Sequence, residues 1–208
     1  MKVLVVGSGG REHAIVWKLS RSSRVDKIYC APGNGGISEL AECLDIGVLD
    51  TESIIKACKD KNIDLVVVAP DDPLAMGMVN ELTKAGIRAF GPTREAALIE
   101  SSKSFSKSLM KKYGIPTAGF ETFDDVNKAM EYIRTQKYPL VVKADGLALG
   151  KGVIICNSEE EAREAVITIM ERKKFGDAGK VIVIEEFLTG QEVSILSFTD
   201  GKTIVPMV

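Results

Sequence analysis

The sequence lacks the long apolar segments of a membrane protein and has little imbalance of charge. No stretch of its 208 residues is long and apolar enough for a transmembrane helix. The first apolar run, Val3–Val6, ends in glycine and is too short for the apolar region of a signal peptide. The net charge of −2 gives no indication of a nucleic-acid or membrane-surface partner. We therefore expect a cytoplasmic protein that acts on small molecules.

Cysteine is also scarce. The four cysteines, Cys30, Cys43, Cys58 and Cys156, include no C-x-x-C pair and fall inside predicted regular elements. This excludes an obvious redox or zinc motif and predicts reduced, buried thiols. With 45% hydrophobic and 27% charged residues, the composition is that of a soluble globular protein.

The first half of the sequence alternates β-branched runs with amphipathic helical stretches. Such alternation predicts a parallel sheet covered on both faces, a Rossmann-like layer of the α/β class. The predicted strands are Lys2–Val6, Lys27–Ala31, Leu65–Ala69 and Arg88–Phe90, and the predicted helices are Glu12–Ser20, Thr51–Lys61 and Asp72–Ala85.

The second half has a different order of elements, which predicts a small α+β unit able to act as a mobile lid. Two further strands after it need partners, because a hairpin alone is marginal. We expect the sequence to be cut at Val208, inside an apolar run. The predicted helices are Thr93–Ser101, Ser102–Tyr113, Asp124–Gln136 and Glu159–Arg172, and the predicted strands are Leu140–Lys143, Val153–Cys156, Val181–Glu186, Glu192–Phe198 and Thr203–Val205.

A first glycine cluster, Gly7 to His13, follows the first strand and opens the first helix. Free N–H groups and the positive end of the helix dipole suit an anion there, with Arg11 as a cationic helper. Glu12 stands where a dinucleotide fingerprint needs glycine, and no acidic residue follows the second strand, so a NAD-dependent dehydrogenase is disfavoured. His13, the only histidine, either donates to the anion or simply packs.

A second glycine cluster, residues 145–152, lies between two predicted strands. It is not a Walker A loop, because its glycines are too closely spaced and Gly152 replaces the Ser or Thr. A loop between antiparallel strands that carries Lys151 can fold over a polyphosphate, or it can be an ordinary solvated hairpin tip. Lys143, at the end of a buried strand, needs a counter-charge or a ligand. The strand that ends at Glu186 leads into a connector whose backbone suits a flat heterocycle.

This order of features resembles the ATP-grasp superfamily, and within it the phosphoribosylamine–glycine ligase family. The resemblance runs through essentially the whole sequence. Its motifs are GSGGREH at 7–13, APGNGG at 31–36, FGPT at 90–93, ESSK at 100–103, KADGLALGKGV at 143–153, FGDAG at 175–179 and IEEFL at 184–188.

The resemblance implies a division of the chain and a set of ATP-binding residues. Residues 1–101 would be the substrate-binding domain, 102–120 a linker and the start of the ATP-grasp core, 121–189 the lid, and 190–208 a truncated start of that core. Lys143 and Lys151 would be catalytic and, with Lys103, would hold the phosphates under the flap. Glu186 and Leu188 would read adenine and Glu192 would hold the ribose. The full implied ATP-binding set is Lys103, Lys143, Gly146, Gly150, Lys151, Gly152, Glu185, Glu186, Phe187, Leu188 and Glu192.

The resemblance also implies the reaction and the second substrate site. ATP would phosphorylate glycine, and the amine of 5-phosphoribosylamine would attack the glycyl phosphate to give glycinamide ribonucleotide. The implied substrate-binding residues are Gly9, Gly10, Arg11, Glu12, His13, Asn34 and Asp71. Asp71 stands where the family usually has Glu, so its contact would be longer or bridged by water. The ligands of Mg²⁺ are expected in a missing C-terminal half, none of them in this chain, which we expect to be inactive alone.

Two other functions remain open at the level of sequence. Another ATP-grasp ligase or carboxylase would share the lid, and the segments 7–13 and 31–36 argue against it. The chain could also be a non-catalytic nucleotide-binding module, which the missing metal ligands favour and the intact lysine and glycine pattern disfavours.

Overall fold

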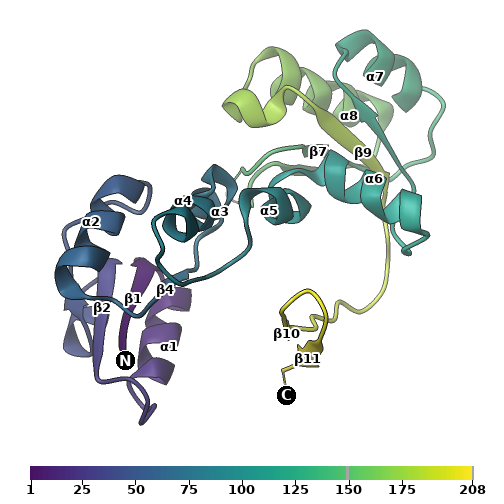
Figure 1. Ribbon diagram of the computed structural model, residues 1–208. Coiled ribbons are helices and arrows are strands. Elements are labelled where there is room, and N and C mark those ends of the chain that lie inside the picture. The colour runs from purple at the N-terminus through teal and green to yellow at the C-terminus, as the bar shows by residue number, and fades with distance from the viewer. Residues whose placement is uncertain (149, 208) are drawn as a thin grey trace.

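The computed structural model describes residues 1–148 and 150–207 and has the mixed α/β architecture that the sequence predicts. Figure 1 shows an N-terminal lobe and a second lobe, which we call the lid after the sequence prediction, with helices α5 (Arg94–Ser101) and α6 (Lys103–Tyr113) between them. A hairpin of β10 (Ser197–Thr199) and β11 (Ile204–Pro206) follows at the end of an extended segment. Among the described residues, no helix is long and apolar enough to cross a membrane.

The N-terminal lobe is built on a parallel sheet of five strands in the order β3-β2-β1-β4-β5. The interior residues of its central strands are buried and almost all apolar, because helices cover both faces of the sheet. Val3 and Val5 pack with α1 on one face, while Leu4 and Val6 pack with α2 and α4 on the other. The elements are β1 (Lys2–Gly7), α1 (Gly10–Leu19), β2 (Lys27–Pro32), β3 (Glu42–Cys43), α2 (Thr51–Lys61), β4 (Leu65–Val68), α3 (Asp71–Met76), α4 (Met78–Lys84) and β5 (Ala89–Phe90).

The lid is an antiparallel sheet in the order β6-β9-β7-β8. Leu140, Val142, Ile182 and Ile184 project to one face, where α7 and α8 cover them to form a second core. Helix α6 contacts β9 from the opposite face. The elements are β6 (Phe120–Phe123), α7 (Val126–Ile133), β7 (Leu140–Ala144), β8 (Val153–Cys156), α8 (Glu159–Val166) and β9 (Ile182–Glu186).

Several predicted elements differ from the structure. The helix predicted over 72–85 is divided at Gly77, whose φ of +89° and closeness to the Arg94 side chain favour glycine. The helix predicted to Arg172 ends as α8 at Val166 and continues as a π-helical turn. The strand predicted over 192–198 is reduced to its last two residues, at the start of β10, because residues 192–196 join no ladder of the described sheets.

Two short strands were not predicted. β3 has only two residues, too few to show a pattern, and β6 is an edge strand whose middle residues are exposed. The prediction of buried cysteines is right for three of the four and wrong for Cys43, which is exposed. Burial raises the pKa of the Cys30 thiol to about 12 and those of Cys58 and Cys156 to about 11, so these thiols stay protonated.

Because the two lobes have separate cores, we predict that each can be destabilised on its own. Leu4 lies in the N-terminal core and Ile182 in the lid core, and both are fully buried. Leu4→Ala and Ile182→Ala should each cost roughly 2–5 kcal/mol. Hydrogen exchange should show lost protection only in the altered lobe, and Leu49→Ala, at an exposed position, should change little. Equal loss in both lobes would show a single cooperative unit.

Candidate functional site

The first candidate site lies at the carboxyl edge of the N-terminal sheet. β1 and β4 are neighbours there, while the connections from them lead to opposite sides of the sheet order. Ligands of open parallel sheets bind at such a switch point. The glycine cluster follows β1 and Asp71 follows β4, so the two segments flank this point. Arg11 Nη2 lies 4.0 Å from Asp71 Oδ2, and both side chains are substantially exposed.

Glu12 fixes the start of α1. Its Oε2 accepts a hydrogen bond of 2.6 Å from the N–H of Gly9, the N-cap residue. Glu12 is only 4% exposed, and its Oε1 is buried without a hydrogen-bond partner. The side chain thus holds the glycine loop from beneath rather than presenting itself to solvent. Glu12 could contact a substrate directly only if the glycine loop moved.

Asn34 connects the two loops of the site. Its Nδ2 donates to Ser8 O over 2.7 Å, and its Oδ1 accepts from the N–H of Ile37 over 2.9 Å. A Cβ on Gly36 would lie 2.7 Å from the ring of His13, so glycine lets the histidine pack closely there. Both polar atoms of Asn34 are therefore used in holding the loops, while the Arg11 guanidinium is 74% exposed and has only the distant Asp71 carboxylate as an ion-pair partner among the described residues.

The second candidate site lies on the α6 side of the lid sheet. Glu185 on β9 is 6% exposed, and its Oε2 lies 3.0 Å from both Lys107 Nζ and Lys143 Nζ. Lys107 also donates to Thr117 Oγ1 over 2.8 Å, so its position is fixed. Two ammonium groups therefore share one carboxylate, which leaves this partly buried unit with a net positive charge. Lys143 therefore has a counter-charge, which is one of the two kinds of partner that the sequence predicts for it.

Lys103 completes the cluster from the first turn of α6. It lines a cavity of about 250 Å³ with Glu100, Lys107, Lys143 and Glu185. Burial lowers the pKa of the Lys103 ammonium; the Asp145 carboxylate opposes this shift, and the Lys143 ammonium adds to it. A bound anion would offset the cost of burying this ammonium, because it would supply a negative counter-charge.

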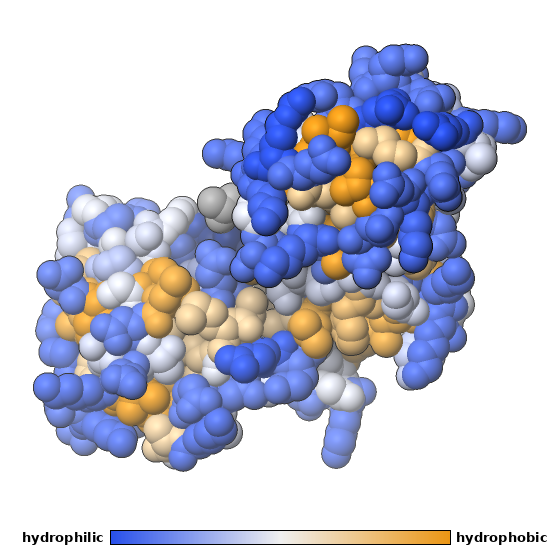
Figure 2. Space-filling view, turned by 90° about the horizontal axis from the view of Figure 1, so that it is seen from above, coloured by the Kyte–Doolittle hydropathy of each residue, from blue (hydrophilic) through white to orange (hydrophobic). Residues whose placement is uncertain are grey.

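An apolar surface adjoins these lysines. Val153 and Ile155 on β8 are 46% and 52% exposed and face the same side of the sheet as Lys143, since Val153 pairs with Lys143 and Ile155 with Val141. In Figure 2, hydrophilic residues cover most of the visible face, and hydrophobic residues gather in separate patches on both lobes. Apolar side chains beside charged ones suit a ligand with a flat ring and an anionic tail.

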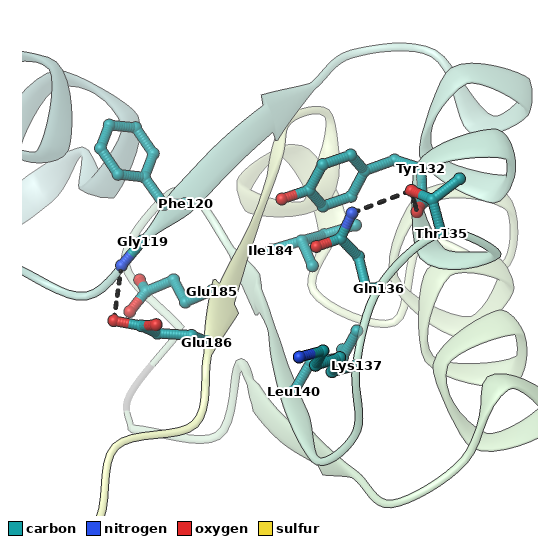
Figure 3. A pocket seen from close by; sticks show the side chains of 10 residues that line it. All are labelled: Gly119, Phe120, Tyr132, Thr135, Gln136, Lys137, Leu140, Ile184, Glu185 and Glu186. Carbon is teal, nitrogen blue, oxygen red and sulfur yellow. Dashed lines mark hydrogen bonds between the residues drawn. The ribbon is translucent and has the colours of Figure 1, made fainter.

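A larger cavity of about 430 Å³ surrounds the end of β9 (Figure 3). Glu186 is fixed there by two bonds to Gly119: its N–H donates to Gly119 O over 2.9 Å, and its Oε1 accepts from Gly119 N–H over 3.0 Å. Tyr132 on α7 and Gln136 in the segment after it also line the cavity. The connector that begins at Phe187 therefore starts from a fixed point.

The remaining predicted ATP-binding residues lie in the segment after β9 and in the glycine loop. Phe187, Leu188 and Glu192 are exposed in the segment after β9, and Lys151 is exposed in the glycine loop. The N–H of Gly146 donates to Ala178 O over 3.2 Å, and the C=O of Gly152 accepts from Ala144 over 2.8 Å, so both ends of the loop are anchored. Gly150 has a φ of +73°. Leu149, within the predicted flap, lies outside the described residues.

Sequence reasoning missed Lys107, and it gave Asp145 no role. The signal for Lys107 was present, because a spacing of four places it on the same helix face as Lys103. Asp145 belongs to the quoted glycine motif, yet its partners come from α6, far away in sequence. Among residues 1–148 and 150–207, no group of three His, Cys, Asp or Glu side chains could hold a metal ion.

Comparison with known proteins gives a consistent family. Residues 1–100 match the model "Phosphoribosylglycinamide synthetase, N domain", and residues 101–208 match "Phosphoribosylglycinamide synthetase, ATP-grasp (A) domain". Phosphoribosylamine–glycine ligase of Clostridium acetobutylicum is 48% identical over 208 residues, which are 100% of this chain and 50% of that protein. The ligase of Brucella melitensis is 51% identical over 207 residues, 100% of this chain and 48% of that protein. The chain thus spans about half the length of these relatives.

Solved structures agree with the sequence relatives. The crystal structure of phosphoribosylamine–glycine ligase from Thermotoga maritima has a TM-score of 0.81 at 33% identity, and covers 99% of this chain and 49% of that one. The biotin carboxylase domain of 2-oxoglutarate carboxylase from Hydrogenobacter thermophilus, in complex with MgADP, has a TM-score of 0.73 at 19% identity, with 90% and 44% coverage. At 19% identity, the similarity to the biotin carboxylase domain shows a shared fold only.

Because Glu185 is the shared counter-ion of two lysines, we predict that Glu185→Gln destabilises the lid. The two ammonium groups, on side chains only 12% and 26% exposed, would lose their carboxylate, which costs about 3 kcal/mol for a buried pair. Chemical denaturation followed by lid-specific hydrogen exchange measures this. Glu186→Gln is the matched control, since its side chain is exposed and an amide oxygen can still accept from Gly119. Equal stability of both variants would show that the Glu185 ion pairs do not stabilise the lid.

Proposed function

Because the chain belongs to the phosphoribosylglycinamide synthetase family, we propose that it is part of an ATP-dependent carbon–nitrogen ligase. The reaction joins glycine to 5-phosphoribosylamine and gives glycinamide ribonucleotide, ADP and phosphate, a step of purine biosynthesis. This chain supplies the lid that receives ATP and the lobe that receives phosphoribosylamine. The observation that carries the proposal is the cluster of Lys103, Lys107 and Lys143 around Glu185.

The triphosphate of ATP fits the charge of this cluster. Lys107 and Lys143 outnumber the single carboxylate between them, and Lys103 forms no ion pair with a carboxylate in the described part of the chain. Phosphate oxygens would complete the coordination of Lys103 and Lys143. Lys151, in the glycine loop, is the further phosphate ligand that the family resemblance supplies, and Gly146, Gly150 and Gly152 give that loop its backbone.

The adenosine end of the nucleotide is assigned to the lid sheet and the segment after β9. Val153 and Ile155 offer an apolar surface for the ring, with Phe187 beside the exit of β9. The C=O of Glu186 and the N–H of Leu188 would meet the adenine edge, with Glu185 assisting. Glu192 would accept hydrogen bonds from the ribose. The two hydrogen bonds between Glu186 and Gly119 support this assignment, because backbone groups that bind adenine must be held in a fixed position.

Phosphoribosylamine is assigned to the switch point of the N-terminal sheet. The N–H groups at Gly9 and Gly10 and the Arg11 guanidinium would hold its phosphate, and His13 and Asp71 would flank the sugar. Glu12 and Asn34 would act by holding the loops, since their hydrogen bonds join Gly9, Ser8 and Ile37. The two-site arrangement matches a ligase that must bring an amine to an activated acid.

The chemistry demanded of these residues is positioning and charge neutralisation. The glycine carboxylate attacks the terminal phosphorus of ATP, ADP leaves, and the amine then displaces phosphate from glycyl phosphate. Lysines 103, 143 and 151 would hold the phosphate charge during the first transfer. Magnesium accompanies ATP in such transfers and neutralises further charge. Residues 1–148 and 150–207 contain no group of three His, Cys, Asp or Glu side chains that could hold this ion.

We predict that Lys103→Ala weakens ATP binding by the chain about tenfold or more, because a charge-assisted hydrogen bond contributes roughly 1.5–3 kcal/mol. Isothermal titration calorimetry with ATP measures the dissociation constant. Lys111→Ala, on the exposed side of the same helix, is the matched control and should bind as the parent does. If both variants bind alike, the cluster is not the phosphate site.

The substrate site is tested in a chimera in which this chain replaces the matching half of the Clostridium acetobutylicum ligase. Arg11→Ala should raise the KM for phosphoribosylamine about tenfold or more and leave the KM for ATP unchanged, because Arg11 belongs to the N-terminal lobe. Arg24→Ala, an exposed arginine in the loop before β2, is the control. An unchanged KM for phosphoribosylamine would exclude the switch-point site, and a chimera without glycine-dependent phosphate release would count against the proposed reaction.

A further inference from the structure

The N-terminus of α6 is capped by an acid from a different part of the chain. Asp145 follows β7, and its Oδ1 accepts a hydrogen bond of 2.5 Å from the N–H of Ser104. Its carboxylate also accepts from Ser102 Oγ over 3.1 Å, and its backbone C=O accepts from the N–H of Lys103 over 3.2 Å. Ser102 Oγ in turn accepts from the N–H of Phe105 over 3.1 Å. The first N–H groups of the helix are thus all satisfied, largely through one residue.

The same residue holds the Lys103 side chain. Lys103 Nζ donates to the C=O of Asp145 over 3.3 Å and to the C=O of Gly146 over 3.1 Å. Its position therefore depends on where the root of the glycine loop lies. These are bonds to neutral carbonyls, so the ammonium keeps its full charge for an anion.

The root of the loop is in turn anchored to the lid. The N–H of Asp145 donates to Val181 O over 3.0 Å, and the N–H of Gly146 donates to Ala178 O over 3.2 Å. α6, β7 and the segment before β9 consequently meet at one point. We refer to Ser102, Lys103, Ser104, Asp145 and Gly146 as the Asp145 junction.

We propose that Asp145 is a positioning residue for the nucleotide site, which it serves by fixing Lys103 and the root of the glycine loop relative to each other. The inference rests on the proposed function, because it gives Lys103 a nucleotide phosphate to meet. Asp145 itself touches no substrate in this account. Its carboxylate is already occupied by Ser104 and Ser102, and it acts only through the lysine and the loop.

Two possible roles of Asp145, as a long-range charge and as a positioning residue, predict opposite changes in the affinity for a polyphosphate when Asp145 is neutralised. Asp145 is an anion close to Lys103, where it helps to keep the lysine protonated. Judged by long-range charge alone, its neutralisation should let a polyphosphate bind more tightly, because one repulsive charge disappears. If its role is to position Lys103, neutralisation should weaken binding, because the bond that orders the first turn of α6 becomes weaker. The direction of the change in affinity therefore separates the two.

The experiment compares Asp145→Asn and Asp145→Ala with the parent chain. Asparagine keeps the shape and an acceptor oxygen, whereas alanine removes both. Asp125→Asn is the matched control: its Oδ1 caps α7 within the same lid, over 2.9 Å, and touches neither Lys103 nor the loop. Hydrogen exchange without ligand reports on residues 103–106 and 145–148, calorimetry with ATP gives the dissociation constant, and circular dichroism verifies the fold.

We expect faster exchange at residues 103–106 in both Asp145 variants, with an ATP dissociation constant raised about threefold in Asp145→Asn and tenfold or more in Asp145→Ala. Asp125→Asn should leave the ATP constant unchanged. Equal or tighter ATP binding by a folded Asp145→Asn would overturn the proposal, as would unchanged exchange at residues 103–106 in Asp145→Ala. If the parent chain does not bind ATP, the proposed nucleotide site is contradicted. In that case hydrogen exchange alone still tests the Asp145 junction, and unchanged exchange at residues 103–106 in Asp145→Ala would refute it.

Discussion

The lid depends on one buried carboxylate shared by two lysines. Glu185 lies near the end of the inner strand β9. Its Oε2 accepts a hydrogen bond from Lys143 of β7 and forms an ion pair with Lys107 of α6, each over 3.0 Å. A lone carboxylate at this depth would carry a desolvation cost of several kcal/mol, and so would the lysines without it. The arrangement holds α6 against the sheet and leaves one positive charge in excess. In the proposed function, the same contacts would provide both the stability of the lid and its affinity for an anion.

In the N-terminal lobe, the loops of the candidate site are held by hydrogen bonds between side chains and the backbone, not by ion pairs between side chains. The parallel strands of this lobe are buried on both faces, and the candidate site lies at their carboxyl edge, where ligands of open parallel sheets bind. There Glu12 and Asn34 hold two glycine-rich loops by bonds to backbone groups. Arg11 is left as the exposed cation of the site. The lobe therefore orders its loops with the buried Glu12 and with Asn34, and carries the Arg11 guanidinium at its surface.

Much of this architecture follows from sequence patterns. The central strands β1, β2 and β4 and helix α2 agree with their predictions almost residue for residue, because long apolar or amphipathic runs with clear caps leave few alternatives. From the cost of burying a lone charge, the sequence predicts that Lys143 needs either a counter-charge or a ligand, and the structure shows a counter-charge. What could not be predicted depends on tertiary contacts: the break at Gly77, the two-residue strand β3, and the joining of Asp145 to α6 across 41 residues of sequence. The identity of Glu185 as the partner of Lys143 likewise required the register of β7 with β9.

The central claim is that the lysine cluster of the lid receives the polyphosphate of a nucleotide. The most direct measurement is a calorimetric titration of the chain with ATP, ADP, AMP and adenosine under one set of conditions. Our account predicts that affinity falls with each phosphate removed, and that high salt weakens ATP binding far more than adenosine binding, since the cluster acts by charge. Equal affinities for ATP and adenosine, or a salt dependence common to both, would contradict it.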